Sequence, residues 1–319
     1  MKINKGIKPV IIFESMLKPY TMERSIIPEF RKLGIEPGKD FILAYAPRKD
    51  WFLEEMEYDG EQRVVASIGA GGEEEVTRIL SLIHEKIVHS GNITSVEVSQ
   101  CLENALVQTG NALINQLMFA YPDVDVRESA RLVNDQTNPI AIGINSAFEL
   151  LLSSQFLIDS APNPNYLTIL NDSLSANYSI QQAIVELLKR KKIEKVSVLG
   201  LLPHENTAEY DSAPSLLLPN LLAMENMKVV VHDPFLSKKK IKKLTGCGSL
   251  GFPQHLEDMD CIILLTSHTC YSMFAKADLM KYLKKCRLIL DNTGLWKRYD
   301  FEKSDGLEFR IIGECLSLQ

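Results

Sequence analysis

The stretch Lys195-Val-Ser-Val-Leu-Gly200 is a short run rich in β-forming residues that ends at a glycine. Such a run is typical of a buried parallel strand that enters a turn. Three similar runs follow, each after a segment long enough for a helix: Lys228–Asp233 (KVVVHD), Cys261–Thr266 (CIILLT) and Arg287–Asp291 (RLILD). Strands that alternate with helices form parallel sheets, so residues 193–319 are predicted to be a complete Rossmann-like α/β domain.

The pattern changes toward the N-terminus. Between residues 95 and 192 the strand signal nearly vanishes, and Val96–Ala120 and Tyr166–Lys192 read as long helices, which predicts a helical central domain. Residues 1–94 again alternate β-rich runs with helical patterns and are predicted to be a partial Rossmann-type domain. The predicted fold class is therefore α/β, with a partial N-terminal domain, a long helical connector and a complete C-terminal domain.

Length and composition limit the class of protein. A chain of 319 residues is longer than one hydrophobic core comfortably serves, and 45% hydrophobic with 24% charged residues is typical of a globular protein. The net charge of -6 argues against a protein that binds the phosphate backbone of nucleic acids. The sequence shows no signal peptide, no apolar run of about 18 residues and no CxxC pair. We therefore expect a cytoplasmic protein with reduced cysteines and with neither a nucleic-acid nor a membrane partner.

No short motif identifies a phosphate, metal or catalytic site. Gly69-Ala-Gly-Gly72 joins a strand-like run to a helix but lacks the GxGxxG spacing, and the carboxylates of Glu73–Glu75 would repel a phosphate there. Leu199-Gly200-Leu201 has one glycine where a nucleotide fingerprint has three. The six histidines form no His-x3-His or Cys/His cluster, so no metal site is expected. His268 and Cys270 follow a predicted strand, but without an identifiable acid partner they make a weak catalytic pair.

A row of amides marks the first long helix. Its members are Gln100, Asn104, Gln108, Asn111 and Asn115, at steps of four, four, three and four residues. This spacing places them near one face of the helix. Such a row can line a polar cleft, or it can be a solvated or interhelical polar face. The spacing alone favours the second interpretation without deciding between them.

Five groups of residues, spread over nearly the whole chain, match one known pattern. They are Val10-Ile-Ile-Phe-Glu-Ser15; Gly38-Lys-Asp-Phe-Ile-Leu-Ala-Tyr-Ala-Pro47; Asn104 with Asn115-Gln116; Val198-Leu-Gly-Leu201 with Asn206-Thr207 and Pro214; and Val231-His-Asp-Pro234. In this order and spacing the sequence resembles the UDP-glucose/GDP-mannose dehydrogenase family. The resemblance implies oxidation of the C6 alcohol of a nucleotide sugar to a carboxylate by two NAD, through a thiohemiacetal on a cysteine.

The catalytic positions that the resemblance implies are substituted in this chain. The family's lysine falls on Gln100, four residues before Asn104, so the amide remains but the cation that would stabilise an oxyanion is absent. The family's nucleophilic cysteine and the acid that follows it map best onto Asn145 and Glu149. An amide cannot form the thiohemiacetal, and no cysteine lies between Cys101 and Cys247.

Other positions of the family pattern are also changed. Met16 replaces a hydroxyl, and Arg48 replaces a carboxylate. In the last domain a lysine is lost and Asp211 stands where the family has an arginine. The glycine fingerprint that holds NAD should precede Val10, where the chain has nine residues. Removal of a nucleophile or of an electrostatic stabiliser costs about two or more orders of magnitude in rate each, so we expect no efficient catalysis.

These observations predict a truncated, non-catalytic family member that binds a nucleotide sugar or acts as a partner or regulator of an active paralogue. The substrate-binding candidates are Asn104, Asn115, His204, Asn206 and Thr207. No catalytic, cofactor-binding or metal residue is assigned; by resemblance alone the catalytic positions are Gln100, Asn104, Asn145 and Glu149. No cofactor is expected for the isolated chain, and NAD follows only from the resemblance.

An enzymatic hypothesis stays open beside this one. A separate chain could supply the missing NAD-binding half-domain, or the site could be rebuilt around Glu149, Asn104 and His204 for different chemistry. The resemblance also implies a homodimer through the long connecting helix, here around Tyr166–Lys192.

Overall fold

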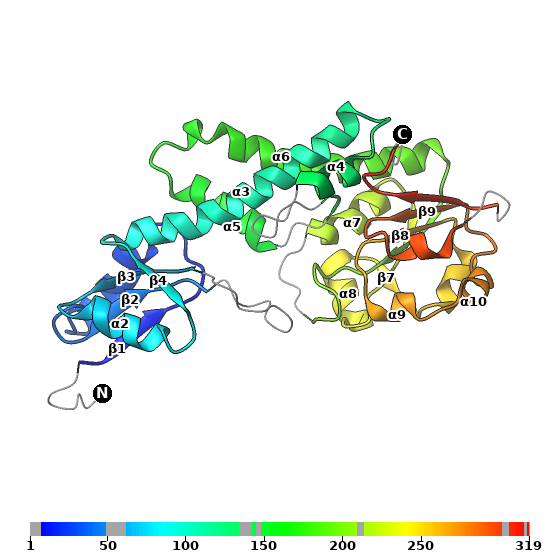
Figure 1. The fold of residues 1–319 in the computed structure, drawn as a ribbon. Helices are drawn as coiled ribbons and strands as arrows, with labels where there is room; N and C mark the ends of the chain where they lie inside the picture. Colours follow the sequence, from blue (N-terminus) through cyan, green and yellow to red (C-terminus); the bar gives the residue numbers. More distant parts are fainter. Residues whose placement is uncertain are drawn as a thin grey trace. The chain divides into compact units, whose positions relative to one another are not determined.

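The computed structural model describes residues 8–48, 62–133, 142–144, 148–208, 214–301, 306–315 and 318. It confirms the predicted α/β class (Figure 1). The chain forms two compact units: unit 1 comprises Met1–Leu106 and Leu152–Leu167, and unit 2 comprises Val107–Leu151 and Thr168–Gln319. The long helices predicted between residues 95 and 192 are thus divided between the two units.

Unit 1 contains a four-stranded mixed sheet in the order β1 (Val10–Phe13), β2 (Ile42–Tyr45), β3 (Gln62–Ile68), β4 (Lys86–His89). The pairs β1–β2 and β3–β4 are parallel, as the alternation of strands and helices predicts, whereas β2 and β3 are antiparallel. No helical pattern separates these two strands in the sequence, and antiparallel neighbours do not need a crossover helix.

Both faces of this sheet are covered. Leu43 and Tyr45 of β2 pack on one face with Met22, while the alternate residues Ile42 and Ala44 pack on the other face against α2. A strand buried on both faces explains why β2 reads as a continuous apolar run. The helical elements that contribute to unit 1 are η1 (Met22–Ile26), α1 (Ile27–Lys32), α2 (Gly72–Leu80), the first half of α3 (Ile93–Ala120), most of α5 (Phe148–Ser160) and η2 (Pro164–Tyr166).

Unit 2 contains a six-stranded, fully parallel sheet in the order β10-β9-β8-β5-β6-β7. Its strands are β5 (Lys195–Leu199), β6 (Lys228–His232), β7 (Gly248–Ser249), β8 (Cys261–Leu264), β9 (Leu288–Asp291) and β10 (Glu308–Ile311). This order is that of a complete doubly wound fold, which confirms the predicted fold class of the C-terminal part. The order reverses between β5 and β8, and ligands of such folds bind beyond the carboxyl ends of the strands at this point.

Helices cover both faces of the unit 2 sheet (Figure 1). They are α4 (Val126–Val133), α6 (Thr168–Arg190), α7 (Leu217–Met224), α8 (Lys238–Thr245), α9 (Thr269–Ser272) and α10 (Lys276–Met280), with the 3-10 turns η3 (Pro214–Leu216), η4 (Gln254–Asp258) and η5 (Leu295–Tyr299). Val196 and Val198 of β5 pack in one core, and Leu199 packs in the other with Trp296.

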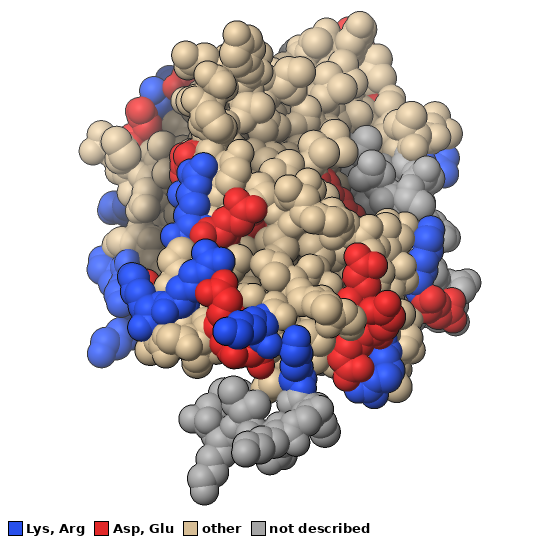
Figure 2. Space-filling model, turned by 90° about the vertical axis from the view of Figure 1, so that its left-hand side faces the viewer, with Lys and Arg blue, Asp and Glu red and all other residues tan. Residues whose placement is uncertain are grey.

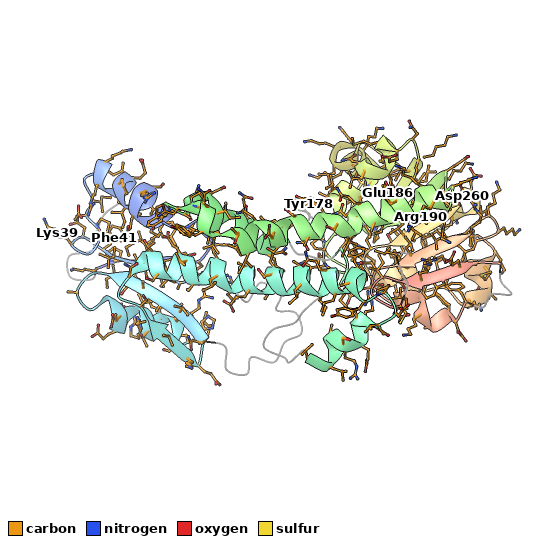
Figure 3. The ribbon with its side chains drawn as sticks, turned by 90° about the horizontal axis from the view of Figure 1, so that it is seen from above. Lys39, Phe41, Tyr178, Glu186, Arg190 and Asp260 are labelled. Carbon is orange, nitrogen blue, oxygen red and sulfur yellow. The ribbon has the colours of Figure 1, made fainter. Side chains whose placement is uncertain are left out.

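Helix α6 belongs to the core of unit 2. Its residues Ile180, Ile184 and Leu188 are fully buried there. Figure 3 labels Arg190 near the end of α6, where its guanidinium donates a hydrogen bond to the Leu318 carbonyl over 3.2 Å. A homodimer through residues 166–192 therefore has only the other faces of this helix available and stays a prediction. Among the described residues, no helix has the length and apolar character needed to cross a membrane.

Gly200 fixes the exit of β5. Its φ of +80° lies in the left-handed region, and a Cβ built on it would lie 2.7 Å from the Cβ of Thr266 and 2.9 Å from the Thr266 backbone nitrogen. Two separate constraints therefore require glycine at position 200. Its backbone is left-handed, and the segment after β8 leaves no space for a Cβ.

We predict that Gly200→Ala lowers the free energy of unfolding by about 3 kcal/mol, because left-handed strain and steric overlap add together. Gly294 is a matched control, since it has a φ of +79° but open space around its missing Cβ. Gly294→Ala has only the conformational cost of about 1 kcal/mol. Urea unfolding measures both variants, and equal losses would contradict the steric part of this explanation.

Candidate functional site

The amide row of α3 points into the protein. Gln100, Gln108, Asn111 and Asn115 are each at most 7% exposed, and Asn104 is half-buried. The structure therefore excludes the interpretation of this row as a solvated face. Gln100 and Asn104 belong to unit 1, and the other three amides belong to unit 2.

In unit 1, Asn104 is held by neutral groups. Its amide nitrogen donates a hydrogen bond to the Ser153 hydroxyl of α5 over 2.9 Å and lies 3.8 Å from the Met16 sulfur. The Ser153 hydroxyl itself lies 2.9 Å from this sulfur. The Gln100 side-chain oxygen is buried and has no hydrogen-bond partner in the described structure. The described contacts of the Asn104 side chain are thus a hydroxyl and a thioether.

Among the described residues of unit 1, Arg63 is a buried cation that the sequence did not single out. It is 3% exposed and donates hydrogen bonds to the Glu14 carboxylate over 2.8 Å and to the Ala46 carbonyl over 2.7 Å. Arg48, which replaces a family carboxylate, is exposed just beyond β2. The ion pair with Glu14 shows that the Arg63 charge is already neutralised by the protein itself.

Five of the six described cysteines are poor candidates for a nucleophile. Burial raises the pKa of the Cys101 and Cys286 thiols to about 12 and that of Cys270 to about 11. Burial also raises the pKa of Cys247 and Cys261. Since the thiolate is the reactive form, these five thiols are inert near neutral pH. Asn145, Asp211 and the side chain of Glu149 lie outside the described residues.

The carboxyl edge of the unit 2 sheet is organised by a buried acid. Asp233, directly after β6, accepts hydrogen bonds from the backbone N–H groups of Leu201, Leu202 and Phe235 over 2.9, 3.3 and 2.9 Å. Burial opposes ionisation of this carboxyl, but the hydrogen bonds from His268 and from the backbone outweigh burial and lower its pKa. Asp233 is also the acid partner of His268 that the sequence alone did not identify, because β6 and the His268 segment meet only in the folded sheet.

Three of the five substrate-binding candidates lie on one loop after β5. The side chain of His204 is half-buried, and Asn206, with a φ of +57°, accepts a hydrogen bond from the Thr269 N–H over 3.0 Å. Thr207 is half-buried, and its buried hydroxyl has no hydrogen-bond partner among the described residues. The loop therefore offers an unused hydroxyl at the edge of the sheet where Rossmann-like folds bind ligands.

The other two candidates do not belong to this loop. Asn115 uses its amide internally, because its oxygen accepts a hydrogen bond from the Gly143 N–H over 2.9 Å and its nitrogen donates to the Gly143 carbonyl over 3.3 Å. Asn104 lies in unit 1. The structure thus assigns Asn115 a role in holding the backbone at Gly143.

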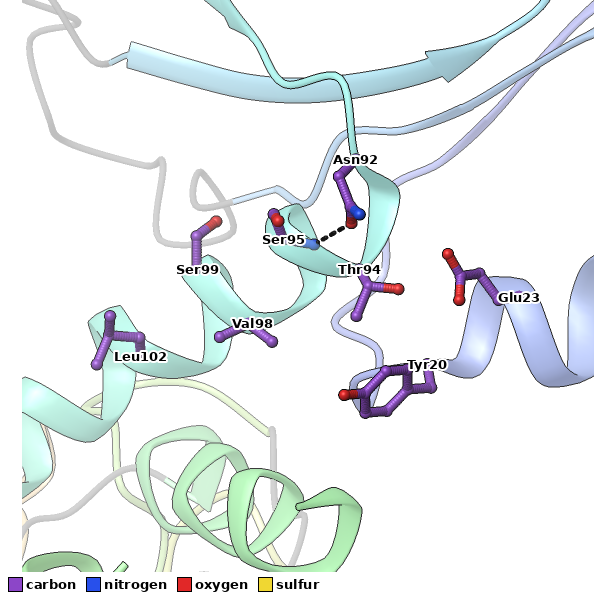
Figure 4. Close-up of a pocket in the computed structure, with 8 residues that line it drawn as sticks. All are labelled: Tyr20, Glu23, Asn92, Thr94, Ser95, Val98, Ser99 and Leu102. Carbon is purple, nitrogen blue, oxygen red and sulfur yellow. Dashed lines mark hydrogen bonds between the residues drawn. The ribbon is translucent and has the colours of Figure 1, made fainter. Parts of the chain in front are cut away.

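A separate open pocket of about 480 Å³ lies in unit 1 at the start of α3 (Figure 4). Its lining residues are Tyr20, Glu23, Asn92, Thr94, Ser95, Val98, Ser99 and Leu102. Asn92 caps the helix by accepting a hydrogen bond from the Ser95 N–H over 2.8 Å. Val98 and Leu102 lie on the face of α3 opposite Gln100 and Asn104, so none of the predicted site residues lines this pocket.

Basic and acidic side chains lie side by side over the charged part of the face drawn in Figure 2. Ion pairs of this kind include Arg31 with Glu36 and Arg78 with Glu75. Within the described part of the chain, no group of three or more His, Cys, Asp or Glu side chains could hold a metal ion.

The part of unit 2 that carries the loop after β5 matches a known family domain. Residues 197–298 match the UDP-glucose/GDP-mannose dehydrogenase family, UDP binding domain. Over nearly its whole length the chain is 24% identical to a UDP-N-acetyl-D-glucosamine 6-dehydrogenase from Pseudomonas aeruginosa, covering 93% of this chain and 73% of that protein. It is 23% identical to a UDP-N-acetyl-D-mannosamine dehydrogenase from Methanococcus vannielii. This match covers 92% of this chain and 69% of that protein.

Solved structures share the fold. The UDP-D-ManNAc dehydrogenase of Pyrococcus horikoshii superimposes with a TM-score of 0.76 at 19% identity and covers 96% of this chain and 73% of its own. The NDP-N-acetyl-D-galactosaminuronic acid dehydrogenase of Methanosarcina mazei superimposes with a TM-score of 0.74 at 19% identity. The superposition covers 98% of this chain and 71% of that structure.

We predict that the native chain at pH 7.5 reacts with iodoacetamide first at Cys315, because this thiol is exposed while the other five are at least partly buried and have raised pKa values. Peptide mass spectrometry after short labelling reads out each site, and labelling in urea is the control for intrinsic reactivity. Rapid native labelling of any of the other five would reveal a stabilised thiolate and contradict this assignment.

Proposed function

Because this chain belongs to the UDP-glucose/GDP-mannose dehydrogenase family, we propose that it binds a UDP-sugar at the carboxyl edge of the unit 2 sheet and does not oxidise it. The observation that carries the binding half is the buried Thr207 hydroxyl, which has no hydrogen-bond partner among the described residues of the free protein. A buried polar group without a partner is costly, and a ligand that supplies the partner recovers that cost.

The position of the loop supports the same ligand class. The loop follows β5 at the point where the strand order reverses, and it lies within residues 197–298, which match the UDP binding domain. The similar proteins from Pseudomonas aeruginosa and Methanococcus vannielii are both named for UDP-N-acetylated sugars. A UDP-N-acetylhexosamine is therefore the first ligand to test.

The chemistry of unit 1 supports the non-catalytic half. Gln100 stands where the resemblance implies a lysine, and the amide beside it is held by Ser153 and Met16 rather than by charged groups. The described hydrogen-bond partners of Asn104 include no cation that could stabilise negative charge developing on oxygen. Five described thiols have raised pKa values, which removes them as nucleophiles for a thiohemiacetal.

The glycine-rich turn at the start of α2 also does not fit an NAD pyrophosphate. The glycine turn Gly69–Gly72 leads from β3 into α2, but the first turn of α2 carries Glu73, Glu74 and Glu75. Three carboxylates at a helix N-terminus occupy the positive end of the helix dipole and repel a phosphate. We therefore propose that the isolated chain acts by binding, as a partner or regulator of an active paralogue.

The test compares the wild-type chain with Thr207→Val by isothermal titration calorimetry against UDP and UDP-N-acetylglucosamine. We expect the wild type to bind and the variant to bind about fivefold more weakly, because one hydrogen bond contributes about 1 kcal/mol. The thermal stability of the ligand-free variant stays equal or rises, since the lost hydroxyl makes no hydrogen bond in the free protein.

Thr168→Val, at an exposed threonine of α6, is the matched control and keeps wild-type affinity. Absence of binding to the wild type at millimolar UDP and UDP-sugar would refute the binding half. NADH formation from NAD and UDP-N-acetylglucosamine by the pure chain would refute the non-catalytic half.

A further inference from the structure

His268 lies at the centre of the contacts that hold the loop after β5. Its side chain is fully buried, its Nδ1 accepts a hydrogen bond from the Asn206 backbone N–H over 3.0 Å, and its Nε2 lies 3.3 Å from the Asp233 carboxylate. Both ring nitrogens therefore have specific partners, one on the loop and one directly after β6. A buried histidine with two such bonds is fixed in orientation as well as in position.

These bonds define the tautomer of the ring. A nitrogen that accepts an N–H hydrogen bond carries no proton, so Nδ1 of His268 is unprotonated. The proton of the neutral ring is then on Nε2, which donates it to the Asp233 carboxylate. Asp233 thus selects the one neutral tautomer of His268 that can accept from Asn206.

The same acid also holds the start of the loop. Asp233 accepts the N–H groups of Leu201 and Leu202, and through His268 it holds Asn206. The Asn206 side chain and Glu205 add bonds to Thr269 and Ser267, next to His268 in the chain. His204 lies between the two held points, and Thr207 directly follows the second.

Asn206 needs this support because its backbone is in the left-handed region, with a φ of +57°. Non-glycine residues adopt this conformation at a cost, and surrounding contacts must maintain it. Loss of the bond to Nδ1 would remove the contact that holds the backbone N–H of the strained residue. Thr207 would then lose its defined position relative to the sheet edge.

We propose that His268, oriented by Asp233, is a positioning residue that fixes the loop 201–208 in the conformation that binds the nucleotide sugar. The identity of the ligand in this inference rests on the proposed function. The role of His268 in holding the loop does not depend on it. The essential feature is a hydrogen-bond acceptor at the Nδ1 position; the imidazole as such is not essential. Two conservative variants separate these features.

His268→Asn places its side-chain oxygen near the Nδ1 position and can still accept from Asn206. His268→Gln keeps a donor near Asp233 but removes the acceptor at Nδ1. In hydrogen–deuterium exchange of the ligand-free chain, we expect the Asn206 amide in His268→Gln to exchange about tenfold faster than in the wild type, while His268→Asn stays near the wild type. We expect the dissociation constant for UDP to rise in His268→Gln and to stay near the wild-type value in His268→Asn.

His255→Gln is the matched control, because His255 is also buried in unit 2 but bonds to Ser197 and Gly251 instead of the loop. It leaves exchange at Asn206 unchanged. Unchanged exchange in His268→Gln, or equal losses in both His268 variants, overturns the positioning role. Faster exchange confined to His268→Gln, in a chain that does not bind UDP, supports the positioning role and refutes only the proposed ligand.

A measurement on the wild type keeps the inference testable if a variant fails to fold. Nitrogen-15 NMR of the His268 ring at pH 7.5 reports directly which nitrogen carries the proton. We expect an unprotonated Nδ1 and a protonated Nε2. The opposite tautomer, or a doubly protonated ring, would leave Asn206 without its acceptor and overturn the inference.

Discussion

Strand β5 is hydrogen-bonded along both edges and buried on both faces, and the rest of unit 2 is arranged around it. Its pairing with β6 and β8 brings Asp233 and His268, which are 35 residues apart, to the same edge of the sheet. Its close contact with the segment after β8 requires Gly200, which turns the chain into the loop. The site candidates are therefore placed by the strand pairing and not by the loop itself.

Polar groups are arranged differently in the two units. In unit 2 a buried carboxylate has several donors, which is the condition under which a buried charge is stable. In unit 1 the positions that the family resemblance assigns to catalysis hold neutral groups, and Arg63 is paired with Glu14. A lone buried lysine at position 100 would need a compensating acid, whereas an amide at this position does not.

The sequence predicted the fold class and the strands β5, β6, β8 and β9, because buried parallel strands carry a strong local signal, as in Lys195–Leu199 and Cys261–Leu264. It did not predict β4, β7 or β10. It did not predict the antiparallel pairing of β2 with β3, since pairing direction depends on a partner distant in the chain. It also grouped Asn115 with His204, Asn206 and Thr207, whereas the structure uses Asn115 to hold Gly143. The neighbouring sequence of an amide side chain is the same whether that side chain binds a ligand or forms hydrogen bonds with the protein backbone.

By itself, the sequence determined the α/β architecture, the family resemblance and the loss of charged groups at family positions, because these depend on residue type and spacing along the chain. Only the tertiary structure decided that the amide row of α3 is buried, that five thiols are shielded, and that His268 has an acid partner in Asp233. The burial of a side chain and the identity of its hydrogen-bond partner depend on which distant segments of the chain meet in the fold. In a parallel sheet those segments meet at the carboxyl ends of strands that are separated by whole helices, so local sequence carries no record of their contact.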